Sequence, residues 1–132
     1  MLYNKQTSYD ENLRVSVAQN VTADDVGKDA GGTPIVLDVG NWKGQALQVN
    51  LSVQAAGANT DVVVYAESSD SQTFASGVYT DEVFIVNETA AVTAPKKYGP
   101  AGFVPKGRYA RIRYDWTAGS LTGATAWLST TH

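Results

Sequence analysis

Few side chains in this 132-residue sequence could perform nucleophilic or acid–base chemistry. The sequence has no cysteine, which excludes disulfides, zinc–thiolate and iron–sulfur sites, and thiol nucleophiles. Its one histidine is the C-terminal residue, His132. A Ser-His-Asp triad or a multi-histidine metal site needs an imidazole held inside a pocket, and a chain terminus is poorly placed for that.

Carboxylates are the remaining candidates for catalysis, because a glycosidase needs only two of them flanking a sugar bond. No spacing isolates such a pair among the acids, most of which lie in expected loops or beside turns: Asp24, Asp25, Asp29, Asp38, Asp61, Glu67, Asp70, Asp81, Glu82, Glu88 and Asp115. Asp24, Asp25 and Asp29 could offer oxygen ligands to calcium, but their spacing matches no EF-hand loop. The glycines within 29–33 do not join a strand to a helix, as a phosphate-binding loop requires. We therefore expect a protein that is not an enzyme and has no cofactor or metal.

Aromatic side chains suggest a binding module instead, since aromatic faces stack on the apolar faces of sugar rings. The candidates are Trp42, Trp116, Trp127, Tyr98 and Tyr109. Two of the tryptophans, Trp116 and Trp127, fall in expected strands, so we expect them in the core. Trp42 lies between two glycines and is the better candidate for an exposed, sugar-stacking ring.

Basic residues gather near the C-terminus, interleaved with aromatic ones. Such a mixture resembles a groove for single-stranded nucleic acid, but the net charge of −3 argues against that partner. Arginine and tyrosine are also enriched at protein interfaces, and an expected long loop at 95–107 could reach a neighbouring chain. We therefore predict a protein interface that includes Lys96, Lys97, Tyr98, Phe103, Lys106, Arg108, Arg111 and Arg113.

Charge is distributed unevenly along the chain. Residues 1–95 carry four basic and twelve acidic side chains, whereas residues 96–132 carry six basic and one acidic. This asymmetry could create a docking surface for an acidic partner, or let copies of the chain complement one another. Alternatively, folding interleaves the two sets of charges within one molecule.

The elements that position these residues are strands. Residues 46–54 alternate aliphatic with polar side chains, which in a strand gives one buried and one exposed face. Residues 109–116 behave likewise and direct Arg111 and Arg113 away from the core. Further strands are expected at 13–17, 35–39, 61–67, 82–86 and 124–130, with shorter pieces around Val21, 77–79 and Phe103.

Seven or eight short strands with little helix predict an all-β fold, a two-sheet antiparallel sandwich of jelly-roll or Greek-key type. We expect one sandwich domain at 13–132, preceded by an arm or short helix at 1–12. No apolar run approaches the length of a membrane helix, and residues 1–10 lack the apolar centre of a signal peptide. We expect a soluble protein with no membrane partner.

Several segments, taken in order, resemble the small cement or decoration proteins of tailed-bacteriophage heads: Met1-Leu2-Tyr3-Asn4-Lys5, Val21-Thr22-Ala23, Asp38-Val39-Gly40, 109–114 and 119–126. The resemblance spans nearly the whole chain. It implies a jelly-roll subunit that forms a homotrimer at three-fold or quasi-three-fold positions on the outer capsid surface and clamps the major capsid protein. It brings no catalytic residue.

On this interpretation the chain is a virion structural protein, made in the host cytoplasm, that binds neither nucleic acid nor membrane. We expect residues 1–10 to form an ordered arm against a neighbour, with Leu2, Tyr3 and Lys5 at the interface. The basic segment 96–113 is expected to meet an acidic surface on the capsid or a sister subunit. The alternative is a carbohydrate-binding module of a tail fibre or adhesion protein that uses Trp42.

Overall fold

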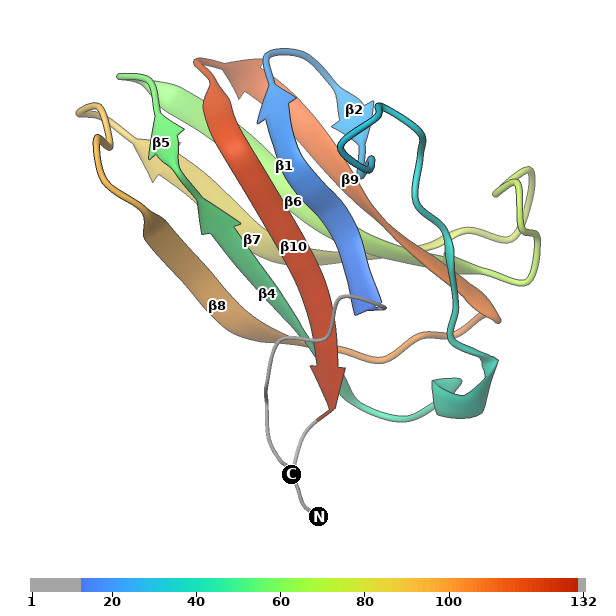
Figure 1. Ribbon diagram of the computed structural model, residues 1–132. Coiled ribbons are helices and arrows are strands. Elements are labelled where there is room, and N and C mark those ends of the chain that lie inside the picture. The colour runs from blue at the N-terminus through green and yellow to red at the C-terminus, as the bar shows by residue number, and fades with distance from the viewer. Residues whose placement is uncertain (1–12, 131–132) are drawn as a thin grey trace.

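The computed structural model, which describes residues 13–130, consists of two antiparallel sheets packed face to face (Figure 1). The first sheet contains, in spatial order, β1 (Arg14–Val21), β10 (Leu121–Thr130), β4 (Leu47–Val53) and β8 (Lys96–Phe103), and β5 (Ala55–Ala56) also pairs with β10. The second sheet contains β2 (Asp25–Val26), β9 (Tyr109–Ala118), β6 (Thr60–Ser69) and β7 (Tyr79–Glu88), and β3 (Leu37–Asp38) also pairs with β9. A single turn of 3-10 helix, η2 (Gly40–Trp42), precedes β4.

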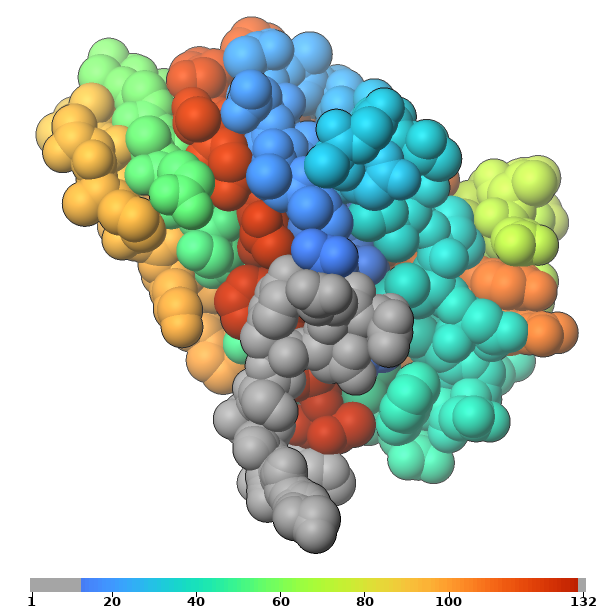
Figure 2. Space-filling model, viewed as in Figure 1, coloured from blue at the N-terminus to red at the C-terminus, as the bar shows by residue number. Residues whose placement is uncertain are grey.

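The strand order is that of a jelly roll. β2 and β3 both pair with β9, and β4 and β5 both pair with β10, so each of these two pairs counts as one strand of the fold. Counted in this way, the strands are numbered one to eight along the chain. The first sheet holds positions one, eight, three and six, and the second holds two, seven, four and five. On the molecular surface the side chains of β8, β4, β10 and β1 form successive bands (Figure 2). The predicted two-sheet antiparallel sandwich is therefore confirmed.

The core forms because strands from both sheets direct every second side chain inward. In β4 the aliphatic positions are buried and the polar positions between them are half-buried, as the alternation predicts. In β9 the buried positions are Ala110, Ile112 and Tyr114, while Arg111 and Arg113 lie on the outer face. The predicted direction of these two arginines is confirmed.

The turn between β9 and β10 depends on a close backbone approach at Gly119. This residue has φ of +79°, and a Cβ atom there would lie 2.4 Å from the Cα atom of Thr60. The hydroxyl of Thr60 donates to the carbonyl of Gly57 and accepts from the N–H of Ser120. Glycine at 119 therefore permits both the left-handed conformation and the contact that joins the two sheets.

One predicted element is wrong. The sequence predicted a Gly-Pro-rich loop at 95–107, but residues Lys96–Phe103 form β8, which pairs with β4 along most of its length. A proline cannot donate to a strand ladder, but it is tolerated at a sheet edge, and β8 is an edge strand. Pro100 falls where the register between β4 and β8 shifts, so the irregularity that suggested a loop is confined within a strand.

Candidate protein-interaction surface

A charged and aromatic layer covers the outer face of the second sheet. It is built on β9, which places Arg111 and Arg113 on that face, and on β6, the next strand. Arg111 lies directly opposite Glu67 in the β6–β9 ladder, and Arg113 lies opposite Tyr65. Since residues two apart on a strand share a face, all four side chains belong to one surface.

The two arginines bind the same carboxylate. The Nε of Arg111 donates to Oε1 of Glu67 over 2.9 Å, and the Nε of Arg113 donates to Oε2 over 3.0 Å. The hydroxyl of Thr80 on β7 adds a third bond, to Oε2. The Glu67 side chain is only 5% exposed, although it lies on the outer face of the sheet. It is thus buried by the side chains that neutralise it.

The pKa of Glu67 follows from two opposing effects. Burial favours the neutral acid and raises the pKa, whereas the hydrogen bonds from Arg113 and Arg111 favour the carboxylate and lower it. The second effect prevails, and the pKa of Glu67 lies below its ordinary value. The carboxylate is therefore ionised at neutral pH and acts as a fixed anion between two cations.

Each guanidinium group also stacks on an aromatic ring. The guanidinium carbon of Arg113 lies 4.5 Å from the ring centre of Tyr65, and that of Arg111 lies 4.1 Å from the ring centre of Phe74. Phe74, in the loop between β6 and β7, is itself buried. Each arginine is thus fixed by one ion pair and one ring. We call Tyr65, Glu67, Phe74, Arg111 and Arg113 the Glu67 cluster.

Donor groups in this cluster remain available. Both ion pairs use Nε, and within residues 13–130 the Nη atoms of Arg111 and Arg113 form no hydrogen bond. Their side chains are 23% and 35% exposed. The arrangement offers oriented N–H donors to an external acceptor, in the fork geometry that matches a carboxylate or phosphate.

Apolar side chains adjoin the cluster on the same face. Ile85 on the edge strand β7 is 58% exposed and lies directly opposite Val63 of β6. Val63 is two residues from Tyr65, so the apolar pair is next to the Arg113 stack. Asp115 lies opposite Val63 on the other side. An exposed aliphatic side chain beside half-buried aromatic and arginine side chains is typical of protein-binding surfaces.

The remaining basic residues are mostly paired within the chain. Lys96 binds Glu88 over 2.6 Å, and Arg108 binds Asp38 over 2.8 Å. Four of the six basic residues in the C-terminal group thus contact acids from the first 95 residues. Folding interleaves the two sets of charges, which was the alternative to a two-sided molecule. Among the described residues, Lys97 and Lys106 form no ion pair.

Two predicted interface residues do not lie on an open surface. Phe103 is 2% exposed and belongs to the core, because its position in β8, opposite Leu47 in the ladder, directs it inward. Tyr98 is half-buried and packs against the core, and its hydroxyl donates to Glu88. Burial and the bond to Glu88 raise the pKa of Tyr98. Phe103 is therefore withdrawn from the interface, and Tyr98 is an internal bridge between β7 and β8.

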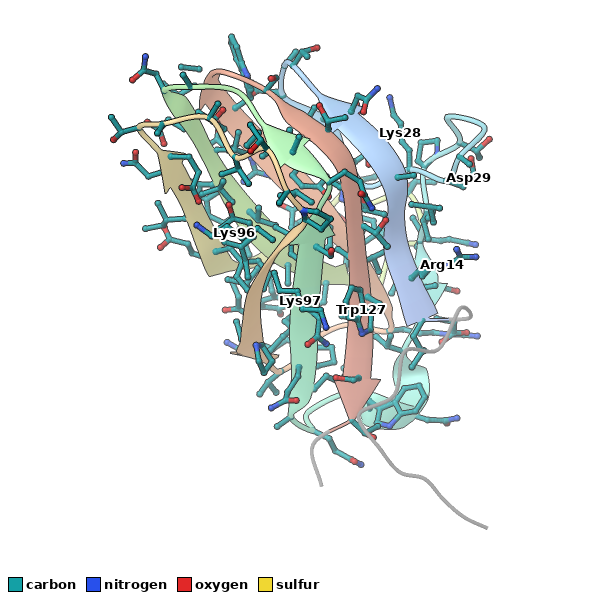
Figure 3. The ribbon with its side chains drawn as sticks, turned by 60° about the vertical axis from the view of Figure 1, so that its left-hand side comes forward. Arg14, Lys28, Asp29, Lys96, Lys97 and Trp127 are labelled. Atoms are coloured by element: carbon teal, nitrogen blue, oxygen red, sulfur yellow. The ribbon has the colours of Figure 1, made fainter. Side chains whose placement is uncertain are left out.

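Other predicted residues lie elsewhere. Lys96 and Lys97 belong to the edge of the first sheet (Figure 3), on a different sheet from Arg111 and Arg113. Lys106 and Arg108 precede β9 and are exposed. The predicted arm at 1–12, with Leu2, Tyr3 and Lys5, lies outside the described residues. Among the described residues of the predicted set, Arg111 and Arg113 meet at Glu67, and Lys96 and Tyr98 meet at Glu88.

The tryptophans occupy three different settings. Trp42 in η2 is half-buried and packs against the core. Trp116 also packs against the core, as predicted, and its indole N–H donates to the carbonyl of Gly119. Trp127 was predicted in the core but lies on the outer face of the first sheet, opposite Arg14 of β1 (Figure 3). The alternation in β10 directs its even-numbered neighbours inward instead.

A cavity of about 540 Å³ opens between the edge strands β7 and β8. Its lining residues include two acids and one base, and they are Ala46, Asp81, Glu82, Gly102, Phe103, Val104 and Lys106. No group of three or more potential metal-ligating side chains occurs in residues 13–130. Within the same residues, no helix is long and apolar enough to cross a bilayer.

Sequence reasoning missed the centre of this surface. Glu67 was treated as one of many acids beside turns, although the expected strand at 61–67 already placed it on the same face as Asp61. The pairing of β6 with β9, which joins residues 44 positions apart, could not be deduced from local pattern. Phe74 and Ile85 carried no signal beyond their hydrophobicity.

The chain matches no protein-family model and no curated protein.

Proposed function

We propose that this chain is a structural protein of the virion, a decoration protein that binds the outer surface of a tailed-bacteriophage head and stabilises the shell. In this role it binds the major capsid protein as a homotrimer at three-fold or quasi-three-fold positions. The jelly-roll strand order agrees with what the motif resemblance implies. The chain acts by binding, not by catalysis.

The observation that carries this proposal is the Glu67 cluster. Two guanidinium groups are fixed by a buried carboxylate and two rings, beside an isoleucine that is 58% exposed. Such an arrangement has the composition and the rigidity of a protein-binding surface. It is built on the central strands of a sheet, so it moves as part of the whole domain.

A rigid domain suits the mechanical task. A packaged genome pushes outward on a shell of repeated subunits, and a protein that binds only the assembled shell adds its binding free energy to shell stability. Three linked copies multiply this effect, because once one copy binds the others are held at high effective concentration. Strands paired along their length transmit load with little deformation.

The direct test mixes purified protein with undecorated phage heads and measures occupancy by sedimentation and mass photometry. We expect saturable binding, a trimeric free protein, and heads that resist heating better when decorated. A second variant lacks residues 1–10 and tests the predicted arm, whose loss should lower occupancy. A monomer that does not bind heads would refute the proposal.

The carbohydrate-binding alternative has its own readout. A glycan array and tryptophan fluorescence would reveal saturable sugar binding, and the Trp42→Ala variant would abolish it if Trp42 stacks on the sugar. Because Trp42 packs against the core, its folding must be checked by circular dichroism. Sugar binding without head binding would replace the capsid proposal by this alternative.

A further inference from the structure

We propose that Arg111 and Arg113 form a receptor for a single aspartate or glutamate side chain of the capsid protein, and that Ile85 and Val63 contact an apolar side chain beside it. This inference rests on the proposed function for the identity of the partner. Its chemistry rests only on the Glu67 cluster.

The donor groups of Arg111 and Arg113 have a fixed orientation. An arginine that is free in solution loses rotamer entropy when it binds a partner, and this loss weakens the interaction. Arg111 and Arg113 have already lost that freedom, because Glu67 holds their Nε atoms and Phe74 and Tyr65 hold their planes. Glu67 thus acts as a positioning residue for a second, external carboxylate.

The Glu67 cluster carries a net positive charge. Two guanidinium groups share one carboxylate, so the cluster has an excess of one positive charge. A single carboxylate in hydrogen-bond reach of both sets of Nη atoms would neutralise that excess. The local geometry therefore favours one acidic side chain over a dense array of anions.

The charges around the Glu67 cluster do not suit a nucleic-acid backbone. A nucleic-acid backbone needs several unpaired cations along its path, but Arg108 is already bound to Asp38. Asp115 and Asp61 lie on the same outer face and would repel further phosphates. The charges around the cluster therefore favour a protein carboxylate over a nucleic acid.

Ile85 and Val63 provide an apolar contact beside the arginines. Burial of Ile85 against a partner would remove an exposed aliphatic surface from water, and Val63 and Tyr65 would extend the contact. An interface core of this kind shields the adjacent ion pair from solvent, which strengthens it. The partner segment is therefore expected to carry an acidic and an apolar side chain close together.

The first experiment measures binding to undecorated heads with matched variants. The double variant Arg111→Lys, Arg113→Lys retains both charges but loses the forked donors, and we expect its affinity to fall by about tenfold or more. The control, Lys28→Arg with Lys43→Arg, makes the reverse exchange at two surface lysines outside the predicted interface and should change affinity by less than about threefold. Wild-type affinity in the arginine variant, or an equal loss in the control, would overturn the inference.

The second experiment does not use heads. In protein labelled with ¹⁵N-arginine, the Nε–H signals of Arg111 and Arg113 are followed by NMR during titration with a synthetic peptide of alternating glutamate and leucine. We expect both signals to shift with this peptide and not with its glutamine–leucine counterpart. If an oligothymidylate shifts them and the acidic peptide does not, the receptor recognises phosphate and the inference is wrong.

These experiments separate the two proposals. Peptide-induced shifts in a protein that does not bind heads would refute the capsid function and leave the carboxylate chemistry standing. If the arginine variant binds heads as well as the wild type does, the capsid function stands and the carboxylate receptor is refuted. If Arg111→Lys with Arg113→Lys dissociates the free oligomer, the carboxylate belongs to a second copy of this chain, and the assignment to the capsid protein is wrong.

Discussion

The outer faces of the two sheets are covered by different kinds of side chain. On the first sheet the central outward positions are uncharged, and Asn50, opposite Trp127, donates to the hydroxyl of Ser129 over 3.0 Å. On the second sheet the corresponding positions carry a carboxylate and two guanidinium groups that bury one another. Both faces cover a backbone of paired strands, but within residues 13–130 only the second face contains a buried charge, that of Glu67.

This difference predicts how each face responds to substitution. A neutral hydrogen bond such as that between Asn50 and Ser129 contributes only about 0.5 to 1.5 kcal/mol net, because unfolding replaces it by hydrogen bonds to water. A buried carboxylate cannot do so, because its ionised form needs the cations that cover it. Substitutions on the outer face of the second sheet should therefore cause large losses of stability that are not additive. Substitutions on the outer face of the first sheet should cause small losses that add.

The largest effect is expected when both cations are removed. The double variant Arg111→Met, Arg113→Met leaves Glu67 without its partners, and the loss of unfolding free energy should be about 3 to 5 kcal/mol. Urea denaturation at neutral pH measures it. The additional substitution Glu67→Met should restore much of the loss, since the uncompensated carboxylate is then absent. A double variant within 1 kcal/mol of the wild type would show that the Glu67 cluster contributes little to stability.

A pH series sharpens the comparison further. The pKa of Glu67 is lowered in the folded state, so its ionised form contributes stability above the ordinary glutamate pKa of 4.5, and that contribution is lost as pH falls toward the folded pKa. Glu67→Gln should therefore reduce the unfolding free energy by about 2 kcal/mol at neutral pH, where two charge-assisted bonds are weakened. The gap between the variant and the wild type should narrow below pH 4.5. A gap of constant size from pH 7 to pH 3 would contradict this account.

The sequence was sufficient to predict the strands whose two faces differ in polarity. The alternation in β4 and β9 predicted which residues face the core, and thus the outward direction of Arg111 and Arg113. It failed for Lys96–Phe103, where glycine and proline in an edge strand resemble a loop. The prediction for Trp127 was also wrong. Tryptophan in a strand is usually buried, but the alternation in β10 directs Trp127 outward and its neighbours Ala126 and Leu128 inward.

The candidate site was only half predictable, for a topological reason. The arginine positions follow from local period, but their carboxylate partner lies on a strand that pairs with β9 only in the folded jelly roll. No local pattern distinguished Glu67 from the acids in loops. The same limit explains why charges that seem segregated along the chain become interleaved in space.

A smaller effect is expected on the first sheet. Asn50→Ala removes the bond to Ser129, and the unfolding free energy should fall by about 1 kcal/mol, the usual net value of one hydrogen bond. Adding Ser129→Ala should cause little further loss from this bond, because it has already been removed. Urea denaturation of both variants provides the check. A loss as large as that of the double arginine variant would remove the proposed contrast between the faces.

The smallest effect on stability is expected at Ile85, and this position separates folding from binding on the second face. Its side chain is 58% exposed, so Ile85→Thr, which keeps the β-branched shape, should alter the unfolding free energy by less than about 0.5 kcal/mol. Occupancy on undecorated heads should nevertheless fall, because the aliphatic contact with the partner is lost. Gln48→Thr on the first sheet serves as the matched control and should leave occupancy unchanged. If Ile85→Thr also leaves occupancy unchanged, the apolar part of this face is not in contact with the capsid, and the arginines alone would have to account for binding.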